Sequence, residues 1–116
     1  MTGHVHVVFG SGPVGRATAV ALVGRGLPVR IVNRRGRAAF GRDAEALRDV
    51  DVATGDLTDA AFATRAAQGA ASVYQTLNPV YHRWAEDFPP LQRAVLAAAE
   101  SAGARLVSMD LSLIHI

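Results

Sequence analysis

Three glycines in the segment GSGPVG have the spacing of a phosphate-binding turn. Gly10, Gly12 and Gly15 follow a short apolar stretch, Val5 to Phe9, and lead into a helix-patterned segment. In such a strand, turn and helix, the first glycine permits the tight turn and the second lets the backbone approach a pyrophosphate. The third lets the helix pack closely on the strand. Pro13 suits the first helical position, which needs no amide donor. Unpaired amides and the positive end of the helix dipole would then face a diphosphate.

The residues after the turn have the pattern of a helix with one apolar face. Val14, Ala17, Ala21 and Leu22 lie on one side of such a helix, so we expect that side to be buried. Gly26 supplies a left-handed C-terminal cap. The segment therefore predicts a helix of about three turns between two strands.

A basic segment follows the second predicted strand, which covers residues 29–32. The dinucleotide fingerprint expects a ribose-binding acid about 20 residues beyond the glycines. Asn33 occupies that place and is followed by Arg34, Arg35 and Arg37. Guanidinium groups bind a 2′-phosphate bidentately, whereas an acid would repel it, so the segment favours NADP over NAD. The alternative is that these arginines are solvated in a surface loop.

Composition limits the classes of function. The 116 residues are enough for one domain, and 50% of them are apolar, so a core can form. The formal net charge of +2 is too small to indicate nucleic acid, and the absence of cysteine excludes disulfide and zinc-thiolate sites. No segment reaches the ~20 apolar residues of a membrane span. We expect a cytoplasmic protein that binds neither nucleic acid nor membrane.

The rest of the chain alternates between helical and strand patterns. Further helices are expected at 43–48, after Thr58 as the N-cap with Asp59 in the first turn, and from Pro89-Pro90 to Gly103. Further strands are expected at 50–52, 73–74 and 106–107, with a polar, aromatic loop at 78–87. Five strands alternating with helices predict an α/β fold, a Rossmann-like doubly wound parallel sheet of order 3-2-1-4-5.

Two other groups of residues could carry chemistry. His4 and His6 share a strand face and could bind a metal, but they lack a third ligand, so a polar terminal strand is the preferred interpretation. The loop residues Tyr81, His82, Trp84, Glu86 and Asp87 could line a substrate pocket or cover the apolar end of the next helix. We predict no metal site and name no catalytic residue.

With these motifs in place, the chain resembles the N-terminal part of NAD(P)-dependent epimerases/dehydratases, the extended branch of the short-chain dehydrogenase/reductase superfamily. The resemblance covers residues 4–110 and rests on GSGPVGRA, NRRGR, GDLTD and VYQTLNPVYHRW. It implies that Asp56, with Leu57, contacts the adenine. It also implies that the residues after the fourth strand lie near the cofactor, where Asn78 could hydrogen-bond a ribose or substrate.

The chain departs from the family pattern in three places. Its glycine turn is one residue shorter than GxxGxxG, Leu77 is bulkier than the usual small residue, and the Tyr-x-x-x-Lys pair is missing, since the chain has no lysine. The predicted cofactor-binding residues are Gly10, Ser11, Gly12, Pro13, Val14, Gly15, Asn33, Arg34, Arg35, Asp56, Leu57, Leu77 and Asn78.

The closing residues 111–116, LSLIHI, resemble a translated sequencing adapter. We therefore expect residues 1–110 to form an incomplete NAD(P)-binding domain and residues 111–116 to be a non-native tail; the alternative is a genuine C-terminal strand. The predicted function is the NADP-binding (or NAD-binding) portion of an oxidoreductase or epimerase that acts on a small molecule, inactive by itself. A non-catalytic NADP-sensing module is the alternative.

Overall fold

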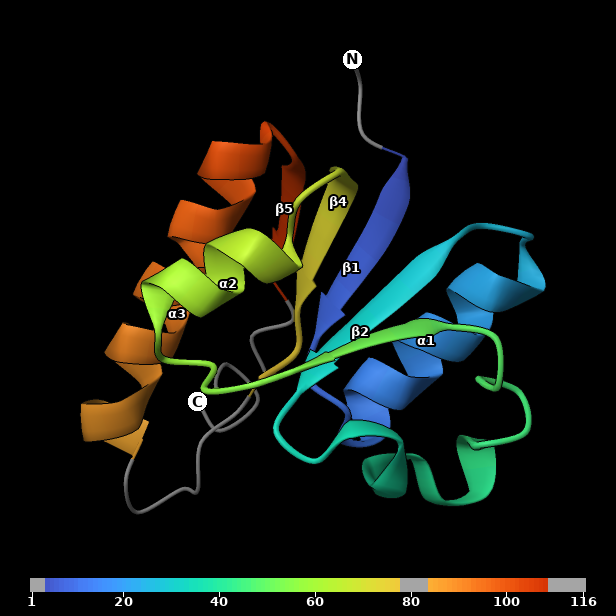
Figure 1. Ribbon diagram of the computed structural model, residues 1–116. Coiled ribbons are helices and arrows are strands. Elements are labelled where there is room, and N and C mark those ends of the chain that lie inside the picture. The colour runs from blue at the N-terminus through green and yellow to red at the C-terminus, as the bar shows by residue number, and fades with distance from the viewer. Residues whose placement is uncertain (1–3, 78–83, 109–116) are drawn as a thin grey trace, which may run out of the picture.

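The chain folds into a parallel sheet between two layers of helices. The computed structural model describes residues 4–77 and 84–108 (Figure 1). Along the chain, its elements are β1 (Val5–Phe9), α1 (Pro13–Gly24), β2 (Val29–Asn33), the 3₁₀ segment η1 (Gly36–Asp43), β3 (Asp51–Thr54), α2 (Ala60–Ala66), β4 (Ala70–Gln75), α3 (Trp84–Ala102) and β5 (Arg105–Ser108). The strand order is β3-β2-β1-β4-β5 and every neighbouring pair is parallel, which confirms the predicted fold class.

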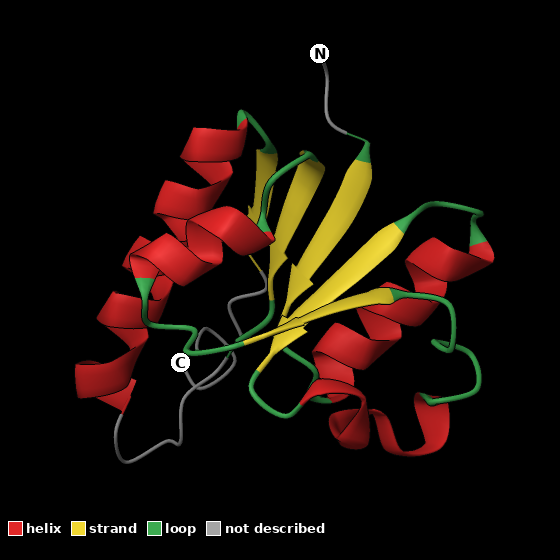
Figure 2. Cartoon of the chain, in the orientation of Figure 1, coloured by secondary structure: helices red, strands yellow, loops and turns green. Residues whose placement is uncertain are grey.

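Each face of the sheet is covered by its own helices. Figure 2 shows α2 and α3 on one side, with α1 and η1 on the other. Alternate residues of β1 point to opposite faces, as expected for a strand buried on both sides. Val7 and Phe9 belong to the apolar cluster under α2 and α3. Val8 belongs to the second cluster, with Phe40 of η1 and Leu22 of α1.

The buried face of α1 differs from the predicted one. Ala17 and Ala21 are exposed, and the residues that face the sheet are Gly15, Ala19 and Leu22. The prediction is right for Leu22 and wrong for Ala17 and Ala21, because an alanine-rich helix has little contrast between its faces. The helix is rotated so that Gly15, where a Cβ would overlap the Gly10 carbonyl, is buried.

The connection between β2 and β3 also differs from the prediction. In place of a helix at 43–48, the structure has η1 at Gly36–Asp43, followed by turns. The guanidinium of Arg37 donates hydrogen bonds to the carbonyl oxygens of Leu47, Arg48 and Val50, so side-chain bonds add to the backbone bonds of the turns in this segment.

The last helix begins earlier than predicted. α3 starts at Trp84, so Pro89 and Pro90 lie in its second turn and part of the predicted loop at 78–87 is helical. Proline lacks an amide donor, and the sequence rule therefore places it at a helix start. At Pro89 and Pro90 the missing amides would have bonded only carbonyl groups in the first turn of α3, and the rest of the helix keeps its bonds. Gly103 ends the helix with a φ of 67°, as predicted.

The N-cap of α2 is one residue later than predicted. The carboxylate of Asp59 accepts hydrogen bonds from the amides of Ala61 and Phe62. The Thr58 hydroxyl donates instead to Asp56 Oδ1, at 2.7 Å. Thr58 therefore shapes the turn ahead of the helix, and Asp59 begins the helix.

Replacing the cap residue should weaken the fold measurably. We expect Asp59→Ala to lower the free energy of unfolding by about 1 kcal/mol, because two first-turn amides lose their acceptor. Asp59→Asn keeps an acceptor oxygen and should restore most of the loss in a urea denaturation series. A larger loss for Thr58→Ala than for Asp59→Ala would contradict this assignment.

Candidate dinucleotide-binding site

The glycine turn lies at the point where the strand order reverses. β1 is flanked by β2 on one side and by β4 on the other. The Gly10 amide donates to the Val32 carbonyl at 2.9 Å, and the Thr76 amide donates to the Phe9 carbonyl at 3.0 Å. The turn is thus tied to both neighbouring strand ends. In doubly wound sheets, ligands bind at this position, outside the carboxyl ends of the strands.

Two of the three glycines are required by the backbone itself. Gly10 has a φ of 115°, and a Cβ there would lie 2.5 Å from Thr76 Oγ1. A Cβ on Gly15 would lie 2.4 Å from the carbonyl oxygen of Gly10. The first glycine therefore makes the turn and the third lets α1 approach β1, as the spacing predicts.

Gly12 has different surroundings. A Cβ at this position would meet no heavy atom within 4 Å, and its φ of −72° is open to any residue. Gly12 is the N-cap of α1, Pro13 follows at the start of the helix, and no side-chain hydrogen bond caps the helix. The space immediately beside Gly12 is therefore open, and the amides in the first turn of a helix, here those of Val14 and Gly15, have no partner within the helix and suit an anion such as a diphosphate.

Asn33 is buried, with 4% of its surface exposed, and its side-chain amide is bonded within the chain. Its Nδ2 donates to Ser11 Oγ at 2.9 Å and to the Gly36 carbonyl at 3.0 Å, while its Oδ1 accepts from the Gly36 amide at 2.7 Å. Asn33 thus connects the end of β2 to the glycine turn. Because Ser11 Oγ accepts this bond, its own proton is left to donate elsewhere.

The three arginines after β2 separate into two roles. Arg34 and Arg35 are exposed, directly beyond the end of β2. Arg37 also carries exposed surface, but its guanidinium bonds three backbone carbonyls of the segment that leads to β3. Two of the three arginine side chains are therefore exposed at this edge of the sheet.

Asp56 and Leu57 follow β3 at the same edge of the sheet. Asp56 Oδ1 accepts from the Thr58 hydroxyl and amide, and these bonds lower the pKa of Asp56; desolvation opposes the shift, and the nearby Arg34 guanidinium lowers the pKa further. Asp56 is thus an exposed carboxylate that stays ionised at neutral pH. Leu57 is buried in the cluster under α2 and α3, so it can offer a ligand only its backbone.

The end of β4 closes the site on the side opposite β2. Thr76 Oγ1 donates to the Phe9 carbonyl at 2.8 Å and lies against both Gly10 and Gly15. Leu77 packs against the apolar cluster under α2 and α3, and its amide and carbonyl bond the side chain of Gln75. Asn78, Tyr81, His82 and the segment 111–116 lie outside the described residues.

Some residues of the site were not predicted from the sequence. Thr76 holds the glycine turn to β4, Gly36 bonds Asn33, and Arg16 bonds the Ser11 carbonyl at 3.0 Å. Only Gly36 carried a usable signal, since an asparagine three residues before a glycine is typical of a side-chain-bonded turn. Thr76 bonds Phe9, and Arg16 also bonds Ala39 and Asp43, so both side chains are placed by contacts with residues distant in the sequence.

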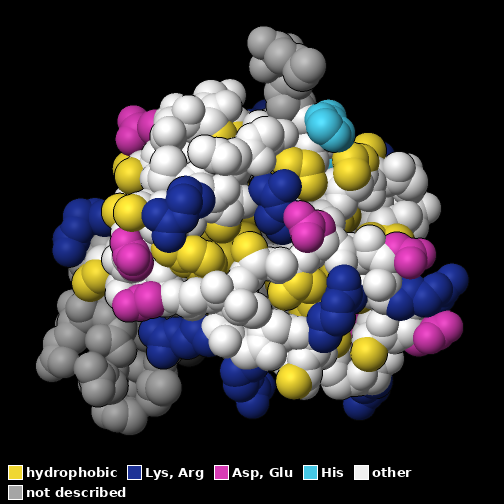
Figure 3. All heavy atoms as spheres, viewed as in Figure 1, with side chains coloured by type: hydrophobic (Ala, Val, Ile, Leu, Met, Phe, Trp, Pro, Cys, Tyr) yellow, Lys and Arg dark blue, Asp and Glu magenta, His cyan; other side chains and the backbone are white. Residues whose placement is uncertain are grey.

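Charged side chains of both signs are spread over the face drawn in Figure 3, with apolar side chains in patches between them. Within residues 4–77 and 84–108, no three histidine, aspartate or glutamate side chains are grouped as a metal site requires. The helices in these same ranges are too short or too polar to cross a bilayer.

Comparisons with known proteins agree with this architecture. No protein-family profile matches the sequence, and no curated protein matches it. Solved structures do match, and they show the fold of Rossmann NAD(P)-binding domains of epimerases and short-chain dehydrogenases/reductases. The predicted resemblance to these proteins is therefore confirmed at the level of the fold.

Three of the matching structures illustrate the range of identity and coverage. A UDP-glucose 4-epimerase superposes with a TM-score of 0.73 at 16% identity, over 90% of this chain and 34% of its own. A short-chain dehydrogenase/reductase superfamily protein from Agrobacterium tumefaciens, with bound NAD, superposes with a TM-score of 0.68 at 27% identity, over 90% of this chain and 32% of its own. ChuY, an anaerobillin reductase from Escherichia coli O157:H7, superposes with a TM-score of 0.65 at 26% identity, over 90% of this chain and 49% of its own. The chain thus spans about a third to a half of the length of these structures.

The different surroundings of Gly15 and Gly12 give a paired test of stability. We expect Gly15→Ala to lower the free energy of unfolding by about 2 to 3 kcal/mol, because its methyl would overlap the Gly10 carbonyl. Gly12→Ala should change the same free energy by less than about 1 kcal/mol, since its methyl enters open space. Urea denaturation of both variants measures this; equal losses would contradict the packing described.

Proposed function

We propose that this chain binds NADP as the cofactor-binding portion of an oxidoreductase or epimerase. The observation that carries the proposal is the open glycine turn at the switch point, beside a strand end that presents exposed Arg34 and Arg35. Both features are needed: an open turn accepts the diphosphate common to NAD and NADP, and the arginines distinguish the two.

The preference for NADP follows from the charges after β2. The position that would hold a ribose-binding acid is Asn33, whose amide is already bonded to Ser11 and Gly36. No carboxylate stands there to repel a phosphate. A 2′-phosphate would place its oxygens within reach of two guanidinium groups, each of which can donate two parallel hydrogen bonds.

The parts of the cofactor can be assigned to different residues. The first-turn amides of Val14 and Gly15 would hold the diphosphate, since Gly12 leaves them open. Asp56 and the backbone of Leu57 would contact the adenine, as the family resemblance implies. The nicotinamide end would lie toward Leu77 and Asn78, and when bound it would supply hydride chemistry toward a small-molecule substrate.

The arginine pair can be tested with both cofactors. We expect the Arg34→Ala/Arg35→Ala variant to bind NADP about ten- to a hundredfold more weakly, because hydrogen bonds between charged groups are lost. NAD binding should change by less than about twofold, since NAD lacks the 2′-phosphate. Isothermal calorimetry at fixed ionic strength measures both dissociation constants.

A matched variant separates a specific contact from a general effect of charge. Arg25→Ala/Arg93→Ala removes the same charge from two exposed positions, one of them at the C-terminal cap of α1. It should leave the ratio of NADP to NAD affinity unchanged. An equal loss for NAD in the Arg34/Arg35 variant would contradict the 2′-phosphate assignment. Failure of the folded, unsubstituted chain to bind either nucleotide at millimolar concentration would contradict the proposal itself.

A further inference from the structure

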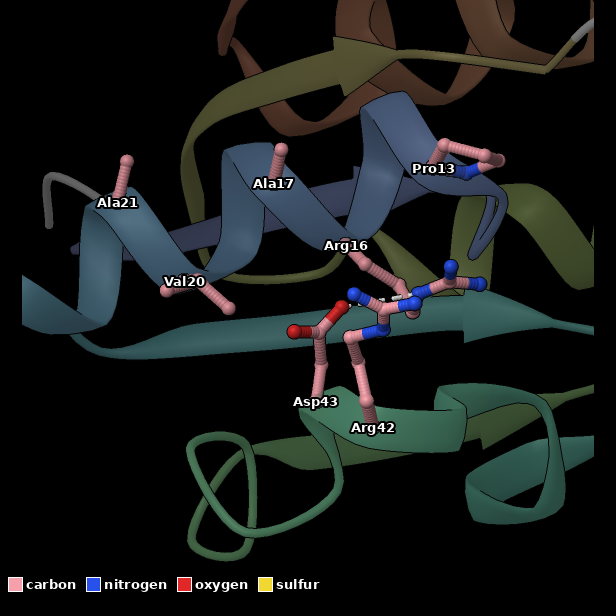
Figure 4. A pocket seen from close by; sticks show the side chains of 7 residues that line it. All are labelled: Pro13, Arg16, Ala17, Val20, Ala21, Arg42 and Asp43. Atoms are coloured by element: carbon pink, nitrogen blue, oxygen red, sulfur yellow. Dashed lines mark hydrogen bonds and ion pairs between the residues drawn. The ribbon is translucent and has the colours of Figure 1, made fainter.

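Arg16 connects the glycine turn to η1. Its Nε is 3.0 Å from Asp43 Oδ2, and its Nη1 donates to the carbonyl oxygens of Ser11, at 3.0 Å, and Ala39, at 3.4 Å. Figure 4 shows Arg16 reaching from α1 toward Asp43 across the groove between α1 and η1. One side chain therefore bonds the residue between Gly10 and Gly12 and two residues of the segment that follows the arginine pair.

Arg34 and Arg35 lie between two anchored points. On one side, Asn33 bonds Ser11 and both backbone groups of Gly36. On the other side, Arg16 bonds η1. Phe40 fixes η1 in the core at one position, but the segment contains two glycines of positive φ, Gly36 at 66° and Gly41 at 54°. The backbone of η1 is kinked at Gly41, whose φ and ψ are not helical, so side-chain bonds help to set how the segment lies against the turn.

We infer that Arg16 is a positioning residue for a nucleotide that carries a 2′-phosphate: it holds η1, and with it Arg34 and Arg35, against the turn that binds the diphosphate. The inference rests on the proposed function and adds a specific role to it. Arg16 acts through Ser11, Ala39 and Asp43, and its own guanidinium is already engaged by them. The diphosphate and the 2′-phosphate of one nucleotide are joined through a single ribose, which limits the distance between them, so their two binding sites must be held in register.

The chain contains a second arginine with the same kind of contacts. Arg30 Nε is 2.8 Å from Asp51 Oδ2, and its Nη1 donates to the carbonyl oxygens of Ala66, at 2.6 Å, and Gln68, at 3.0 Å. The side chains of Arg16 and Arg30 are similarly exposed, 25% and 22%. Because Arg30 bonds the end of α2 rather than the glycine turn, it is a matched control for the loss of a bridging guanidinium.

The test compares Arg16→Met, Asp43→Ala and Arg30→Met in the same chain. The readouts are the NADP and NAD dissociation constants from calorimetry and the thermal midpoint of the unliganded protein. We expect Arg16→Met and Asp43→Ala each to weaken NADP about tenfold more than NAD, as when a supporting residue is removed. Arg30→Met should lower the thermal midpoint without changing the ratio of the two affinities.

The outcomes separate this inference from its alternatives. If Asp43→Ala leaves NADP affinity unchanged or raises it, Arg16 binds the phosphate directly and the positioning role is overturned. The positioning role is also overturned if Arg16→Met and Arg30→Met change the ratio of NADP to NAD affinity equally, because the effect of Arg16→Met is then general destabilisation. If the unsubstituted chain binds NADP and both site variants keep its selectivity, the inference fails alone. If the unsubstituted chain binds no NADP, the proposed function fails and the inference falls with it.

Discussion

The contact between Gly15 and the carbonyl oxygen of Gly10 determines how the candidate site is built. A single added methyl would stand 2.4 Å from that oxygen, so no other residue allows α1 to begin this close to the end of β1. The contact also sets the rotation of the helix, which buries Gly15, Ala19 and Leu22. With the helix fixed in this way, its first-turn amides face the edge of the sheet where β1 and β4 end. The open space beside Gly12 could admit a diphosphate only because the close approach of Gly15 to Gly10 places the start of α1 there.

Side chains that bond backbone groups complete the site. Asn33, Arg16 and Arg37 between them bond carbonyl or amide groups of the turn, of η1 and of the segment before β3. Outside η1 these segments have little regular secondary structure, and buried backbone groups there need partners. The loops are therefore shaped by a few long polar side chains, while the two remaining arginines of the NRRGR segment, Arg34 and Arg35, stay exposed at the edge.

The fold could be predicted from the sequence because its signals are local. Apolar strand residues, the glycine spacing and the left-handed glycines at helix ends are each contained within a few neighbouring positions, and together they predicted the strand order. Two of the errors arose where tertiary contacts decide between similar local options: the face of α1 and η1 in place of a helix at 43–48. The cap of α2 was missed for a local reason, because the Thr58 hydroxyl bonds back to Asp56 and leaves Asp59 to accept from the first-turn amides. Asn33 shows the same limit within the site: its place in the motif was predicted, but its bonds to Ser11 and Gly36 required the structure.

The most direct test of the account is to observe the first-turn amides while a dinucleotide binds. An ¹⁵N-labelled sample of the chain, titrated with NADP and followed by two-dimensional NMR, reports each backbone amide separately. If the glycine turn holds the diphosphate, the signals of Gly12, Val14 and Gly15 will shift most strongly, and those of Arg34 and Arg35 will follow the same binding curve. Unmoved signals at the glycine turn, with shifts concentrated at Ala17 and Val20 in the groove beside η1, would contradict it.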